Sequence, residues 1–456
     1  MTQSPSLASP SAPAEEPAEK APPGPRGRLG VANAYWLATD PLRFLEVMAE
    51  RHGDFVRVDL LGKPWFILSH PRDIESALVE HARVMGRDGY IPILQRTLGM
   101  GLLTSDGELW KRQRKLMAQA FTPKRIEAYA ETMVEVADRG LAWEDGAVVD
   151  IHAEMSRLTM EVVAKVLFGT GIAPEDVKLV GESMETIAAF YANSPEAVLK
   201  LPAWVPTPRN LALERAVARI DGLIYRIIAQ RRREPPRDDL LGILLGACDE
   251  EGARMDDRQL RDEAVTLFLA GHETTALALA HTLTLVSKHP EIERRLATEL
   301  DTVLGGALPE AGSARALRFT EWVIKEGMRL YPPAWVTGRE ATEDVTIGGY
   351  HVPKGAQLMF SEWVVHRDPR WFPNPEAFDP DRWARAAELP RYAYFPFGGG
   401  PRVCIGNHFA MLEATLLLAI VLGRYHLELL PHQHLELVPS VTLRAKRGMR
   451  MRVRRR

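Results

Sequence analysis

The chain has 456 residues, of which 46% are hydrophobic and 26% charged, and its formal net charge is −3. This composition excludes a wholly disordered, collagen-like or disulfide-scaffold protein, and the charge gives no general attraction to nucleic acid or anionic lipid. The two cysteines, Cys248 and Cys404, allow at most one disulfide within the chain and fit a reducing cytosol.

The first 27 residues contain seven prolines and little that could be buried, so residues 1–27 are predicted to be a disordered tail. Residues 28–456 are predicted to form one domain. No signal peptide is evident, and the longest apolar run, 416–422, is far shorter than the roughly 20 residues that span a bilayer. We therefore expect a cytoplasmic protein without a membrane span.

Most of the chain before residue 330 has apolar residues three and four positions apart, which predicts helices. The clearest helical segments are 41–51, 71–82, 125–141 and 213–233. Short strand-like segments lie near both ends of the chain, at 55–60, 65–69, 344–353, 357–365 and 449–454. A mainly helical body with small sheets is an α+β fold. Cys248 ends an apolar helical run and is predicted to be a small buried side chain.

Trp110 and Arg114 are four residues apart, so on a helix they share one face, which could equally be a solvated charged face. Glu326 and Arg329 are three apart and also share a helical face. Surface pairs of this kind are common and contribute less than about 1 kcal/mol.

The segment Ala270-Gly271-His272-Glu273-Thr274-Thr275 lies within an apolar stretch that is predicted to be a helix. Small and polar residues there are out of place for packing alone. Gly271 lets a ligand approach the backbone, and a threonine can bond a carbonyl of its own helix and locally open it. The alternative is a threonine that merely satisfies a carbonyl.

The run Gly398-Gly399-Gly400-Pro401 can be neither helix nor sheet, so it predicts an irregular loop. Cys404 follows, then Gly406 and an amphipathic helix that begins near Asn407. The positive end of a helix dipole favours a thiolate, and the glycines let a large flat group approach the backbone. A lone cysteine near the start of a helix is usually unreactive. The glycine-rich loop before Cys404 is the feature that indicates a functional cysteine here.

The segment FGGGPRVCIG resembles the haem-binding signature of the cytochrome P-450 family of haem-thiolate monooxygenases. The residues that match the signature are Phe397, Gly398, Gly400, Arg402, Cys404 and Gly406. The resemblance extends from about residue 23 to the C-terminus, and the three helical motifs occur in the family's order. It implies the cytochrome P-450 fold, with a long central helix over haem b, and Cys404 as the axial ligand of the haem iron.

The resemblance also implies roles for the other motifs. The residues it places at the cofactor are Trp110, Arg114, Arg339, Arg402, Phe397, Gly398, Ala270 and Gly271, and the basic ones among them would bind haem propionates. Glu273 and Thr274 would support proton delivery during oxygen activation. Glu326, Arg329 and Arg382 would form a buried network that holds the loop around Cys404, where loss of one partner could cost roughly 3–5 kcal/mol.

The activity implied is that of a soluble bacterial monooxygenase that inserts one oxygen atom from O2 into an apolar substrate such as a fatty acid, terpenoid or steroid. Electrons are expected from an external ferredoxin or flavodoxin with its NAD(P)H reductase, since no flavin or iron–sulfur segment follows the haem-binding part. Lys111, Arg112 and Lys115 are a hypothetical docking site for an acidic donor. A monomer is expected. The segments predicted to line the substrate pocket are 90–103, 186–201, 267–274, 334–336 and 441–442.

Two other functions stay open at this level. A haem-thiolate peroxygenase or isomerase would use peroxide without a donor, but members of that kind usually lack the Glu273-Thr274 pair. A haem sensor would need an output module, and none is evident. The histidines form no spacing typical of zinc, so no other metal is expected.

The C-terminal residues 444–456 contain eight basic residues and no acidic one. They would suit a lipid-binding or nucleic-acid-binding tail, or a strand with a basic solvent face. The alternating positions of Met449, Met451 and Val453 favour the strand.

Overall fold

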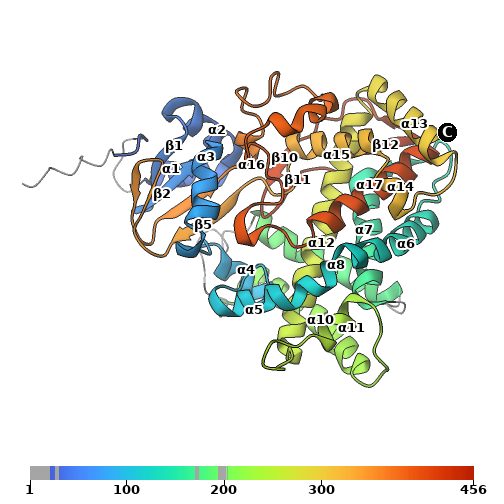
Figure 1. Cartoon of the computed structure of the whole chain (residues 1–456), viewed down its shortest axis with the longest axis horizontal. Coiled ribbons are helices and arrows are strands. Elements are labelled where there is room, and N and C mark those ends of the chain that lie inside the picture. Colours follow the sequence, from blue (N-terminus) through green and yellow to red (C-terminus); the bar gives the residue numbers. More distant parts are fainter. Residues whose placement is uncertain (1–20, 26–29, 170–173, 194–201, 203) are drawn as a thin grey trace, which may run out of the picture.

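The computed structural model describes residues 21–25, 30–169, 174–193, 202 and 204–456. Most of the predicted tail, 1–27, and the end of one predicted pocket segment, 194–201, lie outside the described residues. The described chain has a smaller region rich in strands beside a larger helical region (Figure 1). This mainly helical α+β architecture confirms the predicted fold class.

The strand-rich region combines segments from distant parts of the chain. Its elements are α1 (Val31–Thr39), α2 (Pro41–His52), β1 (Phe55–Leu60), β2 (Lys63–Leu68), α3 (Pro71–Glu75), β3 (Met85–Gly86), β5 (Thr337–Ala341), β6 (Val345–Ile347), β7 (Tyr350–Val352), β8 (Gln357–Phe360) and α16 (Glu362–Val365). One sheet has the order β1-β2-β8-β5-β3, with β2 and β8 parallel and the other pairs antiparallel. The blue and orange strands of Figure 1 therefore share a sheet, and this sheet fixes the position of Arg339 on β5.

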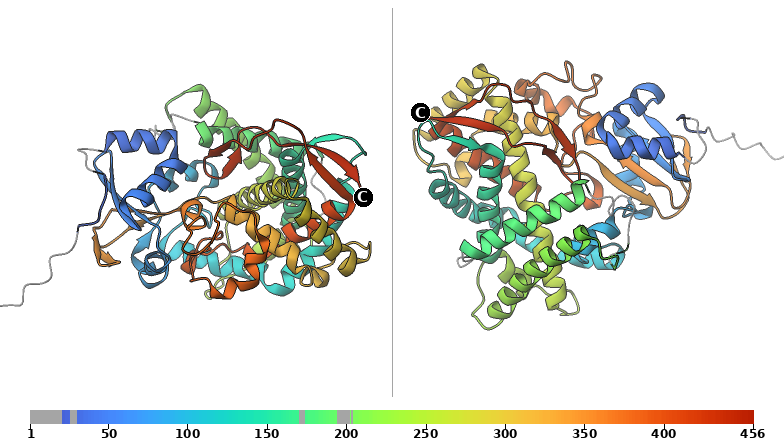
Figure 2. Two further views of the ribbon diagram at one scale, coloured as in Figure 1. Left: turned by 90° about the horizontal axis from the view of Figure 1, so that it is seen from above. Right: turned by 180° about the vertical axis from the view of Figure 1, so that it is seen from behind.

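The helical region surrounds one long central helix. Its helices are α4 (Ile91–Leu98), α5 (Gly107–Ala118), α6 (Pro123–Gly140), α7 (Ile151–Phe168), α8 (Pro174–Asn193), α10 (Pro208–Arg231), α11 (Leu240–Gly246), α12 (Asp257–Val286), α13 (Pro290–Leu304), α14 (Ala311–Ala314), α15 (Arg318–Leu330) and α17 (Asn407–Arg424). The side chain of Asp256 caps α12 by accepting a hydrogen bond from the Gln259 N–H at 2.7 Å. Helix α12 runs through the middle of the molecule in every view and packs against α7, α10, α15 and α17 (Figures 1 and 2).

Helix α17 begins directly after Gly406, as predicted. Among the described helices it is the one that is long and apolar enough to cross a membrane, but 61% of it is buried inside the protein. It packs against α6, α12, α13 and α15. Its apolar residues therefore serve the core of the helical region, and they place Cys404 against that core.

The basic C-terminus is part of a sheet. Strand β12 (Arg450–Arg455) lies between β4 (Val148–Asp150) and β9 (Tyr425–Leu429), with both pairs antiparallel. Met451 and Val453 are buried, whereas Arg450 and Arg454 are exposed, which is the alternation expected for a strand with one dry face. This confirms the strand interpretation. A separate hairpin joins β10 (Leu437–Pro439) to β11 (Leu443–Ala445).

Three predictions about local structure need correction. The segment 357–365 is strand only as far as Phe360, because the Ser361 hydroxyl accepts a hydrogen bond from the Val364 N–H and caps α16. The segment 344–353 is a hairpin, β6 and β7, that turns at two glycines with φ of 59° and 81°.

Cys248 is exposed, so the prediction that it is buried is wrong. Helix α11 ends at Gly246, and Cys248 lies beyond it in a turn, where it forms a β-bridge with Arg254. The apolar run that precedes Cys248 is buried, but the chain leaves the core before reaching the cysteine.

Candidate active site

The loop before α17 has a backbone that only glycine allows at one position. Gly400 has a φ of 64°, and a Cβ atom there would lie 1.9 Å from the Leu78 carbonyl oxygen. The Gly400 N–H donates to the Tyr392 hydroxyl at 3.0 Å, and the Cys404 N–H donates to the Phe397 carbonyl at 3.0 Å. These contacts close the loop and direct Cys404 to a fixed place at the start of α17.

Cys404 lies deep among protein atoms, yet its side chain is accessible. Burial raises the pKa of the Cys404 thiol, while a hydrogen bond from the Gly406 backbone and the charge of Arg114 lower it. An accessible side chain in dense surroundings faces an internal space. Gly398, with a φ of 70°, also leaves open space where a side chain would be.

Helix α12 shows an accessible stripe in its middle. Residues 260–266 and 275–286 are all buried, but the stripe between them is not. It consists of Leu267, Ala270, Gly271 and Thr274, and Ala270 is fully in the exposed class. Spacings of three and four place these residues on one helical face. A small, accessible face on a central helix leaves its backbone open to approach by a ligand, which is the role that the sequence motif predicts for it.

Glu273 and Thr274 of the α12 motif are held differently. The Thr274 hydroxyl donates to the Ala270 carbonyl of its own helix at 2.7 Å. The Glu273 side chain extends away from the helix. Its carboxylate accepts a hydrogen bond from the Thr442 hydroxyl at 2.6 Å and forms an ion pair with Arg444. The predicted pocket segment 441–442 thus meets the α12 motif, and Arg444 joins them although no sequence pattern marks it.

A group of arginines lies between the strand-rich region and α5. Arg402 forms an ion pair with Asp106, and its guanidinium lies 4.2 Å from the centre of the Trp110 ring. Arg402 and Arg87 both donate to the Ser105 carbonyl, at 3.2 Å and 3.4 Å. The sequence reasoning placed Arg402 and Trp110 at one site but missed Arg87, which stands in a short segment with no motif around it.

The positive charge of this group exceeds what the protein neutralises. Arg339 is only 6% exposed, and the one side-chain hydrogen bond that it makes within the described chain goes from its guanidinium to the Gly338 carbonyl, at 2.7 Å. Burial and the charge of Arg402 lower the pKa of Arg339 to about 10. Burial and the charges of Arg402 and Arg339 likewise lower the pKa of Arg87 to about 9. Buried cations that repel one another fit a bound anion.

Glu326, Arg329 and Arg382 meet in one buried network. Glu326 and Arg329 are both 0% exposed and form a bidentate pair, with contacts of 2.8 Å and 3.0 Å. Arg382 Nε lies 2.9 Å from Glu326, and the Trp383 indole also donates to this carboxylate at 3.0 Å. Both oxygens of the buried Glu326 carboxylate therefore accept hydrogen bonds from protein donors.

This network reaches the cysteine loop through one histidine. Arg329 donates to the His366 carbonyl at 2.9 Å, and the His366 Nε2 accepts from the Phe395 N–H at 3.0 Å. Phe395 begins the loop that ends at Cys404. The Tyr394 hydroxyl also donates to the Lys325 carbonyl of α15 at 3.0 Å.

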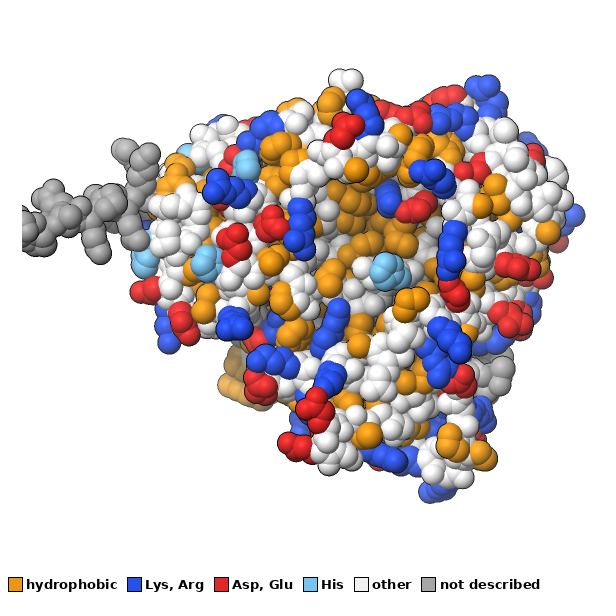
Figure 3. Space-filling view, in the orientation of Figure 1, with side chains coloured by type: hydrophobic (Ala, Val, Ile, Leu, Met, Phe, Trp, Pro, Cys, Tyr) orange, Lys and Arg blue, Asp and Glu red, His pale blue; other side chains and the backbone are white. Residues whose placement is uncertain are grey.

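The basic residues on α5 that were considered for donor docking are all paired within the chain. Lys111 forms an ion pair with Glu108 at 2.6 Å, and Arg112 forms one with Asp249 at 2.6 Å. Lys115 is paired with Glu250. Figure 3 shows blue and red side chains interspersed around an apolar hollow on this face of the molecule. No uniformly basic surface stands out in that view.

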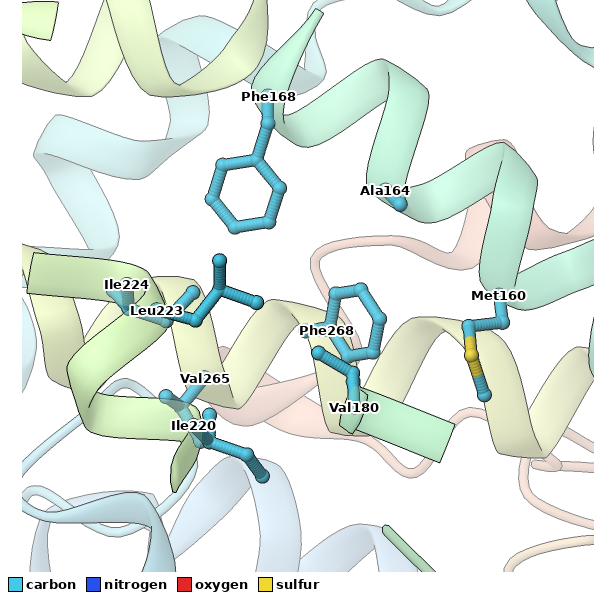
Figure 4. A pocket seen from close by; sticks show the side chains of 9 residues that line it. All are labelled: Met160, Ala164, Phe168, Val180, Ile220, Leu223, Ile224, Val265 and Phe268. Carbon is cyan, nitrogen blue, oxygen red and sulfur yellow. The ribbon is translucent and has the colours of Figure 1, made fainter. Parts of the chain in front are cut away.

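A small cavity of about 10 Å³ lies between α7, α8, α10 and α12, and all of its lining side chains are hydrophobic (Figure 4). The lining residues are Met160, Ala164, Phe168, Val180, Ile220, Leu223, Ile224, Val265 and Phe268. The space is about that of one water molecule, which is too small for an organic substrate. Of the predicted pocket segments only 267–274 contributes a lining residue, Phe268, and Cys404 and the motif residues Glu273 and Thr274 do not line it, so we interpret it as a packing defect.

Comparison with known proteins gives this arrangement its family. Residues 22–449 match the sequence profile described as Cytochrome P450. Cyclooctatin synthase of Streptomyces melanosporofaciens is 38% identical over 419 residues, which cover 89% of this chain and 90% of that protein. Cyclooctat-9-en-7-ol 5-monooxygenase of the same organism is 35% identical over 414 residues, 90% of this chain and 89% of that protein. Pentalenene oxygenase of Streptomyces avermitilis is 33% identical over 431 residues, which cover 93% of this chain and 95% of that protein.

The chain belongs to the cytochrome P450 family. It is a haem-thiolate monooxygenase, and its cofactor is haem b. The described residues fit this cofactor in three ways. A thiol at the end of a glycine loop is accessible, a small-residue face of α12 is open, and Arg114 and Arg339 form no ion pair with a carboxylate within the described chain, which suits the two propionates of haem.

Proposed function

We propose that this protein hydroxylates a cyclic terpenoid. The observation that carries the proposal is the 33–38% identity, over most of the chain, to three bacterial proteins, two of which are named for oxygenation of cyclooctat-9-en-7-ol and pentalenene. The apolar character of the accessible α12 face supports it, because apolar walls suit a hydrocarbon skeleton. A fatty acid would call for a partner for its carboxylate; in the described part of the predicted pocket segments the one lysine or arginine is Arg96, which already donates to the Asn210 side-chain oxygen at 3.0 Å and lies against the Phe190 ring.

In this proposal the Cys404 thiolate would bind the haem iron. Trp110, Arg114, Arg339 and Arg402, joined by Arg87, would hold the propionates. Phe397, Gly398, Ala270 and Gly271 would contact the macrocycle. When bound, thiolate-ligated haem supplies the redox chemistry that activates dioxygen.

Thr274 and Glu273 are proposed to deliver protons. Thr274 lies on the accessible face of α12, and its hydroxyl is oriented by the bond to the Ala270 carbonyl. Glu273 can exchange protons with solvent and pass them toward this face. Glu326, Arg329 and Arg382 act at a distance from the chemistry by holding the loop around Cys404.

Electrons are proposed to come from an external ferredoxin or flavodoxin with its NAD(P)H reductase, in a cytoplasmic setting. The ion pairs of Lys111, Arg112 and Lys115 weaken the idea of a simple basic docking patch, because a donor would have to compete with the paired acids. Charge reversal at Lys115, which is 66% exposed, tests this directly by its effect on the rate of electron transfer.

The deciding experiment is a spectral binding titration with purified holoprotein, using cyclic terpenes, steroids and fatty acids of matched size. We expect a haem spectral change with the cyclic terpenes and a hydroxylated product when surrogate redox partners and NADPH are added. Binding and turnover confined to fatty acids or steroids would contradict the proposal. Cys404→Ser should abolish the red-shifted Soret band of the reduced CO complex, and a normal thiolate spectrum in that variant would refute the ligand assignment.

A further inference from the structure

The carboxylate of Glu273 is held by a hairpin that is distant in sequence. Thr442 donates to Glu273 Oε1 at 2.6 Å, and the Arg444 guanidinium binds the same oxygen. The side chains are largely buried, with 14% of Glu273 and 26% of Arg444 exposed. Within the described chain no hydrogen bond is made to Oε2. One oxygen of the carboxylate is therefore fixed, and the other is free.

The β10–β11 hairpin is suited to this contact by its alternation. Thr442 and Arg444 are two residues apart and so face the same side, toward α12, while Leu443 faces the opposite side. Leu443 is fully buried in a cluster with Trp335. The Leu443 N–H donates to the Pro333 carbonyl at 2.9 Å, and the Trp335 indole donates to the Ser440 carbonyl at 2.8 Å. One side of the hairpin is thus fixed to the core through Leu443, and the other side binds Glu273.

The Glu273 side chain needs these two contacts because of its position on the helix. Adjacent residues on an α-helix point about 100° apart, so Glu273 does not face the same way as Thr274. A free glutamate side chain has several rotamers, and most of them would move the carboxylate away from its present position. Two donors that fix Oε1 limit these rotamers and hold Oε2 at one place beside the α12 face.

We propose that Thr442 and Arg444 are positioning residues for proton delivery, acting through Glu273. The inference rests on the proposed role of Glu273 in the reaction. A proton on Oε2 passes toward Thr274 and is replaced from solvent, while Oε1 stays bound to the hairpin. Without the hairpin contacts the carboxylate turns away, and reduced dioxygen is released as peroxide instead of entering product.

The test compares Arg444→Gln, Thr442→Val and Arg444→Lys in the haem-loaded protein with surrogate redox partners. Product formed per NADPH should fall about threefold to tenfold in Arg444→Gln, with a larger solvent deuterium isotope effect on product formation and more peroxide. Arg444→Lys should recover part of the loss because it restores the charge. The matched control is Lys446→Gln, which breaks an exposed ion pair with Glu436 on the same hairpin and should change neither coupling nor isotope effect.

A double-mutant cycle separates this inference from the proposed function. If Glu273→Gln stays coupled, the role of Glu273 itself fails. If Glu273→Gln uncouples the reaction but Arg444→Gln and Thr442→Val do not, the hairpin inference is overturned. If it is right, Arg444→Gln adds no further loss in the Glu273→Gln background. Should Arg444→Gln lose haem, measured by its CO spectrum, Thr442→Val gives the decision, because it keeps Arg444 and removes one donor.

Discussion

Thr274 and Thr284 make the same local hydrogen bond on α12 but face different surroundings. Each hydroxyl donates to the carbonyl four residues earlier at 2.7 Å. Thr284 is 2% exposed in the core, whereas Thr274 is on the accessible stripe. Replacing either threonine by valine removes the same hydrogen bond to the helix backbone. Comparing the two variants therefore separates an effect on the stability of α12 from an effect on the reaction.

Thr274→Val should lower product formed per NADPH by about tenfold, the loss expected when one positioned proton donor is removed while water still reaches the site. Peroxide formation should rise by a matching amount, and NADPH consumption should continue. The measurement is product, peroxide and NADPH in the same reaction. Thr284→Val should leave the coupling unchanged, and equal uncoupling in the two variants would assign the effect to α12 packing.

At this scale the sequence reasoning found residues that belong to local motifs and missed those that do not. The loop around Cys404 and the α12 stripe follow from neighbouring residues, so they could be predicted. Arg87 and Arg444 come to the site through the tertiary fold: Arg87 has no motif around it, and Arg444 lies beside the predicted pocket segment 441–442 but was grouped with the basic C-terminal run, so its contact with Glu273 was not predicted. The prediction for Cys248 is wrong because an apolar run does not show where the chain leaves the core.

Among the elements, α15 carries two glutamates whose environments differ strongly. Glu326 is 0% exposed and binds Arg329 and Arg382, whereas Glu321 is 41% exposed and binds Lys325. Removing the charge of a buried partner leaves two guanidinium groups unpaired, but the loss of an exposed pair is compensated by water.

Glu326→Gln should therefore lower the free energy of unfolding by about 3–5 kcal/mol, and Glu321→Gln by less than about 1 kcal/mol. Chemical denaturation of the holoprotein, followed by circular dichroism, measures both values. We also expect Glu326→Gln to lose thiolate ligation at a lower denaturant concentration, since the network reaches Phe395 through His366. A small effect at Glu326, similar to that at Glu321, would contradict a buried network.

The first turns of α12 contain a buried acid that makes stability depend on pH. Glu263 is 0% exposed and accepts a hydrogen bond from the Leu102 N–H at 2.9 Å, and burial raises its pKa to about 8. The folded chain thus binds a proton more tightly than the unfolded chain does. The stabilising effect is complete below about pH 4.5 and is lost as the pH rises to about 8.

Glu263→Gln keeps the acceptor for Leu102 but cannot ionise. Its unfolding free energy should fall less than that of the wild type between pH 6 and pH 8.5, and urea denaturation across this range measures the difference. The control is Glu108→Gln on α5, an exposed residue for which the pH dependence should match the wild type. If Glu263→Gln and the wild type lose stability in parallel, Glu263 does not titrate as its burial requires.

Element prediction succeeded where periodicity was long and failed where a cap or turn decided the outcome. The segments 41–51, 125–141 and 213–233 are helices because their apolar stripes face a core, which the sequence pattern records. In 357–365 the same apolar composition continues through a change from strand to helix, and only the hydrogen bond that caps α16 at Ser361 marks it. The pairing of β2 with β8 joins strands almost 300 residues apart, and no local pattern predicts it.

At the scale of the whole molecule, the site gathers positive charge from three parts of the chain. Arg339 comes from the strand-rich region, Arg402 from the cysteine loop and Arg114 from α5. Arg114 and Arg339 form no ion pair within the described chain, and burial lowers the pKa of both, although the charges of Asp88, Glu362 and Asp106 raise that of Arg339. Folding thus keeps incompletely neutralised cations near Cys404, which opposes stability until an anion binds.

Haem should therefore stabilise this fold by more than its apolar contacts alone would provide. We expect thermal unfolding of the haem-loaded chain at a higher temperature than that of the haem-free chain, because a ligand that binds only the folded state adds stability. In Arg339→Met this gain should shrink by a few degrees, corresponding to one lost hydrogen bond to a charged group, about 1.5–3 kcal/mol. The haem-free variant should unfold no lower than the haem-free wild type, since it no longer buries an unpaired cation. Arg43→Met, which removes an exposed arginine of α2, is the control and should leave the gain unchanged. An Arg339→Met chain whose gain equals that of the wild type would show that Arg339 does not bind the cofactor.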